Sequence, residues 1–202
     1  MRKDFKIIVI SPEETLVKEA QKVIELFEAG LGAFHLRKPN ATKQELIQYL
    51  ENIPKRYHKK IILHNHYELL RKFKINGVHL SEKKRKTAGV ISLLNRKKIK
   101  IISSSFHSIK DIGRSRRKYD YVFLSPVFDS ISKKGYKKNF SIQGIKASLS
   151  SLQQSVIALG GITDKNITLL EDAGFKGAAT IGYIWNSKTS VKKFKTLLSK
   201  IK

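Results

Sequence analysis

The chain has 202 residues, of which 41% are hydrophobic, a formal net charge of +25 and no cysteine. This length and apolar content suffice for a sizeable core, so we expect a single domain over residues 1–202. No apolar stretch approaches the roughly 18–20 residues of a membrane-spanning helix. The lack of cysteine excludes disulfides and a thiolate nucleophile, and is consistent with a cytoplasmic protein.

The positive charge does not by itself indicate a nucleic-acid partner. The excess is mainly lysine and is spread along the chain, for example over 95–100 and 192–202. Interfaces that read or stack on bases use arginine and aromatic residues among the charges. We therefore interpret the lysines as solvated helix faces, and expect neither a specific nucleic acid nor a membrane as partner.

Eight short apolar runs recur along the chain, each followed by a polar or glycine-rich joint. Most are rich in Val, Ile and Phe and are short enough for strands buried on both faces. The first run follows basic residues, but it is too short for a signal peptide. The predicted strands are residues 5–10, 32–36, 60–64, 77–80, 100–103, 121–125, 156–160 and 177–182.

Amphipathic stretches lie between these runs and predict helices. Residues 14–30 carry apolar side chains at helical spacing and end at a glycine. Residues 42–53 begin with Thr42 and Glu45, the pattern of a capping box. Helices are also predicted over 164–174, with a capping aspartate, and over 190–201, whereas the segments after residues 66 and 81 predict only short helices.

Alternating strands and helices predict parallel βα units. Eight such units close most simply into a (β/α)₈ TIM barrel, an α/β fold. The alternative is an open doubly wound sheet, but no GxGxxG motif follows the first run. In a barrel the chemistry lies where the strands end, so the residues at those positions are the candidates for a site.

Histidines gather at these strand ends. Histidine exchanges protons near neutral pH, so several histidines at one barrel mouth indicate acid–base chemistry. Of the six histidines only His58 lies elsewhere, and the other five are His35, His64, His66, His79 and His107. His64 and His66 share one face of a strand and raise the alternative of a metal site, but no carboxylate except Glu82 is placed beside them. We predict no bound metal.

Two joints suit an anion. Gly160 and Gly161 precede a predicted helix, and bare backbone N–H groups at a helix N-terminus bind phosphate. The segment DYVFLSPVFDSISKK (120–134) turns from an apolar run into the hydroxyl and lysine side chains of Ser130, Ser132 and Lys133. A tight turn alone would also use glycine, but the two joints together favour a phosphate site.

Six segments, taken in chain order, make the sequence similar to the thiamin phosphate synthase/TenI family over nearly its whole length. Most are weak individually, but their order on successive predicted strands is specific. The resemblance implies a (β/α)₈ barrel and a role in thiamin biosynthesis. The segments are HLRK (35–38), GVHLSE (77–82), SSSFHS (103–108), DYVFLSPVFDSISKK (120–134), ALGGIT (158–163) and GAATIGYI (177–184).

The resemblance implies one of two chemistries. Family synthases join a pyrimidine pyrophosphate to a thiazole phosphate, and Mg²⁺ neutralises the departing pyrophosphate. TenI-type members aromatise a thiazole carboxylate phosphate by moving a proton, with a histidine after the fifth strand as acid and base.

The sequence departs from the synthase pattern where the metal would bind. An Asn-Asp pair after the third strand is replaced by His64-Asn65, and an aspartate after the fourth strand by Lys84. Mg²⁺ requires hard oxygen ligands, usually one or two carboxylates, and a lysine repels it. On the second strand, the pattern Gln-x-Arg-x-Lys becomes His35, Arg37 and Pro39, so that Lys38 is the nearest second cation.

The resemblance therefore favours a TenI-like thiazole tautomerase that uses no cofactor. His107 is the expected catalytic residue, and Arg37 would pair with the substrate carboxylate. The expected substrate-binding residues are Arg37, Ser105, Ser130, Ser132, Lys133, Gly160, Gly161 and Gly182, and further candidates are His35, His64, His66 and Lys38.

Two alternatives stay open. The first is a thiamin phosphate synthase with an altered site, and only this alternative would need Mg²⁺. The second is a non-catalytic protein that binds thiazole or thiamin phosphates. The expected partner in each case is a phosphorylated small molecule, and a homodimer remains an open alternative.

Overall fold

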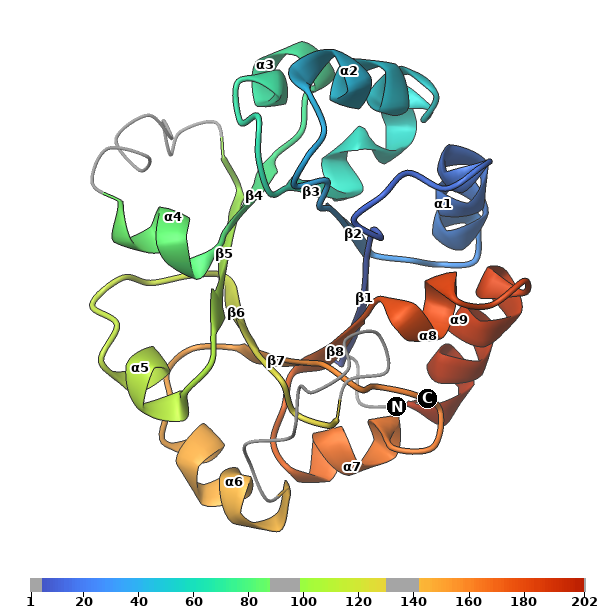
Figure 1. The fold of residues 1–202 in the computed structure, drawn as a ribbon. Helices are drawn as coiled ribbons and strands as arrows, with labels where there is room; N and C mark the ends of the chain where they lie inside the picture. Colours follow the sequence, from blue (N-terminus) through green and yellow to red (C-terminus); the bar gives the residue numbers. More distant parts are fainter. Residues whose placement is uncertain (1–4, 88–98, 130–141, 202) are drawn as a thin grey trace.

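Eight parallel strands close into a barrel in the computed structural model, which describes residues 5–87, 99–129 and 142–201 (Figure 1). The strands neighbour one another in sequence order, and β1 pairs with β8 to complete the ring. The predicted (β/α)₈ fold is therefore confirmed. The strands are β1 (Lys6–Ile10), β2 (Ala33–Leu36), β3 (Ile61–Leu63), β4 (Gly77–Leu80), β5 (Ile101–Phe106), β6 (Tyr121–Leu124), β7 (Val156–Leu159) and β8 (Gly177–Thr180).

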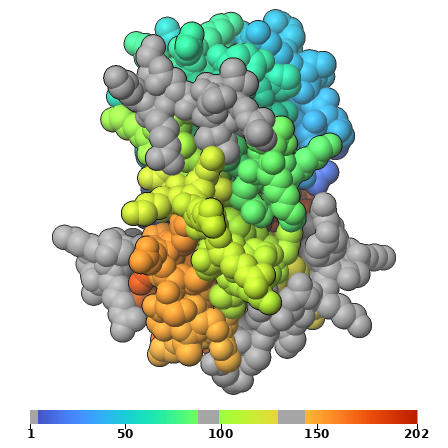
Figure 2. All heavy atoms as spheres, turned by 90° about the vertical axis from the view of Figure 1, so that its left-hand side faces the viewer, coloured from blue at the N-terminus to red at the C-terminus, as the bar shows by residue number. Residues whose placement is uncertain are grey.

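Helices form a ring outside the strands (Figure 1). Figure 2 shows one side of this ring, where the atoms of α5 and α6 lie next to each other. None of the helices that the structure describes is long and apolar enough to span a membrane. The helices are α1 (Glu19–Glu28), α2 (Lys43–Glu51), the 3₁₀ helix η1 (Lys55–Lys60), α3 (Leu69–Phe73), α4 (Glu82–Lys86), α5 (Ile109–Gly113), α6 (Ile142–Ser150), α7 (Ile167–Asp172), α8 (Gly182–Trp185) and α9 (Ser190–Lys200).

The alternation of side chains along each strand divides the core into two parts. Outward-facing residues such as Val9, Phe34 and Leu36 are fully buried beneath the helices. Inward-facing residues fill the barrel, because successive residues of a strand point to opposite faces. One part of this interior is apolar and contains Ile8, Ile10, Phe123, Ile157 and Ala179.

The other part of the interior is polar. His35, His79 and Ser103 are each at most 1% exposed, and they lie among hydrogen-bond partners rather than solvent. Burial, and then the neighbouring His79, hold the pKa of His35 well below its usual value. Burial, followed by the positive charges of Arg37 and Lys84, lowers the pKa of His79 to about 3. Both rings are therefore neutral at physiological pH.

Helix α1 begins five residues later than the predicted helix at residue 14. The reason is the ammonium group of Lys38, which is 1% exposed and donates to the carbonyl oxygens of Pro12 and Glu14 at 2.9 Å each. The same Nζ atom lies 2.8 Å from Oε2 of Glu19. Residues 12–18 therefore wrap around a buried cation instead of forming helical turns, and Lys18 adopts a left-handed conformation with φ of 57°.

The other predicted helices agree more closely. Thr42 and Glu45 form the expected capping box at the start of α2. The helix predicted from residue 164 begins at Ile167, because the side chain of Asn166 accepts a hydrogen bond from the backbone of Thr163 and closes a turn there. The short helices expected after residues 66 and 81 are α3 and α4.

The buried pair of Lys38 and Glu19 yields a stability prediction. Glu19→Gln would leave the Lys38 ammonium buried without a counter-charge, so we expect the free energy of unfolding to fall by about 3–5 kcal/mol. Urea denaturation measures this value. Glu51→Gln is the matched control, because Glu51 and Lys72 form an ion pair with both side chains about half exposed, and we expect a loss of no more than about 1 kcal/mol. Equal losses in the two variants would contradict the prediction.

The neutral histidines in the barrel yield a pH prediction. As the pH falls below about 6.5, these two side chains become protonated in the unfolded chain but stay neutral in the folded chain. Their effect on the free energy of unfolding is therefore negligible above that pH, and the free energy of unfolding decreases as the pH falls below it. We expect His35 and His79 each to cost about 2 kcal/mol of unfolding free energy at pH 5. Urea melts between pH 7 and 5, in buffer with a chelator, measure this slope. His35→Gln should reduce the slope, and an unchanged slope would contradict the assignment.

Candidate functional site

A cavity of about 530 Å³ opens at the carboxyl ends of the strands. Its wall contains residues from the ends of β2, β3, β4, β5, β6, β7 and β8, which lie far apart in the sequence. The barrel brings them together because parallel strands all end at the same rim. Among the predicted site residues, those that line the cavity are Arg37, His64, Ser105, His107, Gly160, Gly161 and Gly182.

His107 follows β5 and is the half-exposed histidine of the cavity wall. Its Nδ1 atom lies 2.8 Å from the carbonyl oxygen of Ser125. A carbonyl oxygen only accepts hydrogen bonds, so Nδ1 carries a proton and the neutral form of the ring has its lone pair on Nε2. Nε2 lies 4.0 Å from Oε2 of Glu82, whose negative charge would stabilise a protonated ring. This geometry suits a general base that becomes a general acid.

Glycine is required at the turn after β7. Gly160 and Gly161 have φ of +101° and +64°, and a Cβ atom on Gly161 would collide with Phe128 and with the carbonyl oxygen of Asp129. Within the described part of the chain, the backbone N–H groups of these two glycines have no hydrogen-bond acceptor. They line the cavity together with Gly182, so the turn offers donors to an anion.

Arg37 supplies a positive charge at the opposite wall. Its backbone is held by Ser11, whose Oγ accepts from the Arg37 N–H at 2.8 Å and donates to its carbonyl at 2.9 Å. Its guanidinium contacts Glu13 at 2.8 Å, with the two side chains 35% and 44% exposed. Ser11 did not stand out in the sequence, because a serine at a strand end carries no distinctive signal.

The residues at the site do not fit a Mg²⁺ ion. Asn65 donates its amide to the Lys38 carbonyl, and Lys84 donates its ammonium to the His64 carbonyl at 2.7 Å. The described carboxylates of the cavity wall are Glu13 and Glu82, which form ion pairs with Arg37 and Lys86. Each described carboxylate of the cavity wall is thus already in an ion pair, whereas Mg²⁺ usually takes one or two carboxylates as ligands.

Three histidines form a hydrogen-bonded group at the floor of the cavity. Nδ1 of His35 lies 2.9 Å from Nε2 of His64, and the other nitrogen of His35 lies 2.6 Å from the hydroxyl of Tyr121. His79 lies between the hydroxyls of Ser103 and Ser105, at 2.9 and 2.7 Å. Burial, then His79 and His35, and then Arg37 and Lys84 hold the pKa of His64 well below its usual value.

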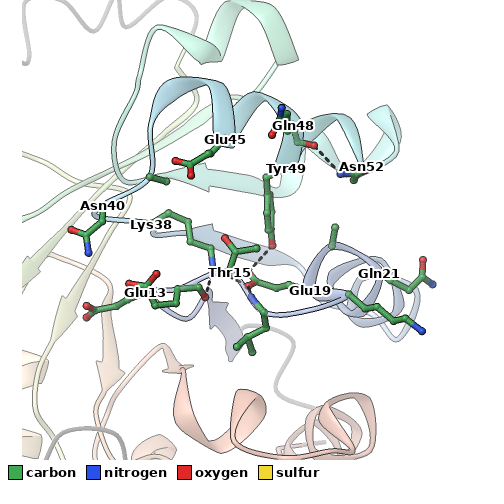
Figure 3. Close-up of a pocket in the computed structure, with 15 residues that line it drawn as sticks. Glu13, Thr15, Glu19, Gln21, Lys38, Asn40, Glu45, Gln48, Tyr49 and Asn52 are labelled. Atoms are coloured by element: carbon green, nitrogen blue, oxygen red, sulfur yellow. Dashed lines mark hydrogen bonds and ion pairs between the residues drawn. The ribbon is translucent and has the colours of Figure 1, made fainter.

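Two predicted candidates lie elsewhere. Lys38 points away from the cavity and lines a separate depression outside the barrel, where it and Tyr49 converge on Glu19 (Figure 3). His66 adopts φ of 50° directly after β3, which turns its ring towards Glu68 and the carbonyl oxygen of Ala41. The strand geometry that would have placed His64 and His66 on one face therefore ends before His66. Ser130, Ser132 and Lys133 lie outside the described residues.

Comparisons with known proteins identify the family of the chain. A family model described as "Thiamine monophosphate synthase" (TMP-TENI) matches residues 7–184. A "Thiamine-phosphate synthase" of Dictyoglomus turgidum is 24% identical over 202 residues, covering 97% of this chain and 90% of that protein. Another of the same description, from Prochlorococcus marinus (strain AS9601), is 29% identical over 181 residues, which cover 87% of this chain and 47% of that protein. The chain thus spans about half the length of the Prochlorococcus relative.

A solved structure gives the same result. The crystal structure of a thiamine phosphate pyrophosphorylase from Bacteroides thetaiotaomicron superposes with a TM-score of 0.81 at 28% identity, and 98% of each chain is covered. The resemblance predicted from the six segments is confirmed by the family match over most of the chain. The chain therefore belongs to the TMP-TENI family of thiamin-biosynthesis enzymes.

Proposed function

We propose that this protein is a thiazole tautomerase, which aromatises a thiazole carboxylate phosphate by moving a proton. One observation carries the proposal. The Nδ1 atom of His107 donates to a backbone carbonyl, so in the neutral ring the lone pair lies on Nε2, at the wall of the cavity. A general base needs a free lone pair within reach of the substrate, and His107 meets that requirement.

In this mechanism His107 acts twice. Its Nε2 atom first takes the proton from the ring carbon, and the imidazolium is stabilised by Glu82, 4.0 Å away. The ring electrons then form an enolate-like intermediate, whose negative charge is stabilised by Arg37 and the other cations near the cavity. His107 finally returns the proton to the exocyclic carbon, which leaves an aromatic ring. The proton count balances, and no metal or redox partner is needed.

The remaining groups of the cavity would hold the substrate. The backbone N–H groups of Gly160 and Gly161, with the turn at Gly182, suit the phosphate. Arg37 suits the carboxylate, because a guanidinium binds carboxylates with two parallel hydrogen bonds. Ser105 also lines the cavity, and its hydroxyl is bonded to Nε2 of His79 at 2.7 Å.

A second candidate function is thiamin phosphate synthesis. The printed names of the relatives and of the similar crystal structure support it more directly than they support the tautomerase. The identity of the residues speaks against it, because Asn65 and Lys84 stand where the resemblance places metal-binding carboxylates. The two candidates share a phosphorylated thiazole as substrate but differ in their need for Mg²⁺.

The acid–base role of His107 is tested by substitution. We expect His107→Gln to lower the rate of thiazole aromatisation by about 10²–10⁴-fold, because a general acid–base residue contributes that much. Proton NMR of the product, together with solvent deuterium incorporation, measures the rate. Substrate affinity should change little. His66→Asn is the control, since His66 does not line the cavity, and full turnover by His107→Gln would exclude the proposed mechanism.

The second candidate is tested with its own substrates. The protein is incubated with a pyrimidine pyrophosphate and a thiazole phosphate, with and without Mg²⁺, and thiamin phosphate is measured by chromatography. We expect no Mg²⁺-dependent product, because the described carboxylates of the cavity wall are in ion pairs and a lysine stands where the resemblance places a metal-binding aspartate. A turnover of the usual enzymatic magnitude, roughly 1 s⁻¹ or more, would establish the synthase and refute the tautomerase as the main function.

A further inference from the structure

Three histidines on adjacent strands form a compact group of nitrogen ligands. His35 in β2, His64 after β3 and His79 in β4 each offer one ring nitrogen, and these atoms all lie within 4.8 Å of one another. His35 and His79 are buried, and His64 is half-buried at the cavity wall. We propose that this group binds one divalent transition-metal ion of the class of Zn²⁺ or Co²⁺.

The donor set selects this class of ion. Imidazole nitrogens suit zinc, cobalt, nickel and copper, whereas Mg²⁺ takes carboxylate and water oxygens. A metal binds the neutral form of histidine, and a protonated ring must first lose its proton.

Neighbouring hydroxyls hold two of the rings in the way that metal ligands are usually held. The hydroxyl of Tyr121 lies 2.6 Å from Nε2 of His35, and Oγ of Ser103 lies 2.9 Å from Nδ1 of His79. The second nitrogen of each ring is also hydrogen-bonded, Nδ1 of His35 to His64 at 2.9 Å and Nε2 of His79 to Oγ of Ser105 at 2.7 Å, and an ion would replace these two bonds. A hydrogen bond to the far nitrogen fixes the tautomer and orientation of a ligating histidine, and this partner strengthens metal binding.

The distances require one local movement. A tetrahedral zinc site with Zn–N bonds of about 2.0–2.1 Å places its nitrogens about 3.3 Å apart. His35 and His64 already approach to 2.9 Å through a hydrogen bond, which the ion would replace. The rings of His64 and His79 stack with centroids 4.3 Å apart and an interplanar angle of 21°, so one of them must turn before both can direct a nitrogen at the same ion. His64 is the ring that can turn, because it lies after the end of β3 and faces the cavity.

The position of the group gives the ion an open coordination site. Since His64 and His79 both line the cavity, the side of the ion without protein ligands would face the substrate space. Three protein ligands and one open position are the pattern of catalytic rather than structural zinc sites. The positive charges of Arg37 and Lys84 act on His79 and oppose a cation at this position, so an anion in the cavity should offset them and strengthen the binding of the ion.

Cobalt titration tests the proposal without any use of enzyme activity, so it succeeds or fails independently of the tautomerase. The full-length protein is freed of metal with a chelator and titrated with Co²⁺, with and without inorganic phosphate. We expect one Co²⁺ per chain, with the intense visible absorption of a four- or five-coordinate ion, and its loss on addition of Zn²⁺. Phosphate should tighten the binding.

Substitutions then assign the ligands. His35→Gln and His64→Asn retain hydrogen-bonding side chains and should each weaken Co²⁺ binding more than about 100-fold, beyond the effect of losing an outer partner. Tyr121→Phe removes only the hydroxyl on His35 and should weaken it about 10–100-fold. His66→Asn is the control, since His66 lies only two residues from His64 but outside the cavity, and it should leave the affinity unchanged.

Three results would overturn the proposal. They are the absence of a stoichiometric Co²⁺ spectrum, full affinity in a folded His64→Asn protein, and an equal loss of affinity in His66→Asn. Circular dichroism and thermal melting of each metal-free variant verify that it folds. If the buried His35→Gln variant does not fold, His64→Asn decides, because its side chain is already half-buried at a cavity wall and tolerates replacement.

Discussion

The structure depends on one constraint, which is that every polar group inside the barrel must find its partner there. A buried hydroxyl or imidazole without a hydrogen bond costs far more than the bond itself contributes. His35, His79, Ser103 and Tyr121 meet this condition by bonding along and across β2, β4, β5 and β6. The polar half of the interior therefore has a defined arrangement, on which the floor of the cavity rests. The side chains of the apolar half, such as Ile8, Ile10 and Ile157, require close packing but no specific hydrogen-bond partners.

This division separates two kinds of histidine. Those in the floor are neutral and are held by other side chains, so they orient groups or bind ligands through lone pairs. His107 stands apart at the rim, half exposed, with one nitrogen tied to a carbonyl and the other facing a carboxylate. Proton exchange needs access to solvent and a ring that can carry charge. Among these four rings the position at the rim combines both, and this is the reason for which we propose His107 as the acid–base residue.

The sequence predicts much of this fold because its local signals agree. The same alternation of strands and helices is indicated by the eight apolar runs, by the capping box at Thr42 and by the glycines at the ends of helices. The start of α1 was not predictable, because the amphipathic pattern of residues 14–30 carries no sign of the ammonium that draws residues 12–18 away from the helix. Long-range polar contacts of this kind override local propensity.

The positions of the site residues could likewise be predicted only in part from the sequence. The rule that strand ends meet at one rim predicted that Arg37, Ser105, His107 and the glycine turns would share a cavity, and they do. The rule could not predict which side chains at the strand ends point into the cavity. His66 turns away because the chain adopts a positive φ directly after β3, and Lys38 is drawn outward by Glu19. The meeting of His35, His64 and His79 needs the register between three strands, which a single sequence does not contain.

The hydrogen bonds between Ser11 and the backbone of Arg37 connect the cavity wall to the first helix. The Ser11 hydroxyl forms hydrogen bonds with both the N–H and the carbonyl of Arg37. The ammonium of the next residue, Lys38, donates to the carbonyl oxygen of Pro12 and to Glu19 in the first turn of α1. The end of β2 and the residues before α1 are thus held together by hydrogen bonds and an ion pair, so they are expected to move together. A substitution of the buried Glu19, in the first turn of α1, would therefore disturb the position of Arg37 although the two residues do not touch.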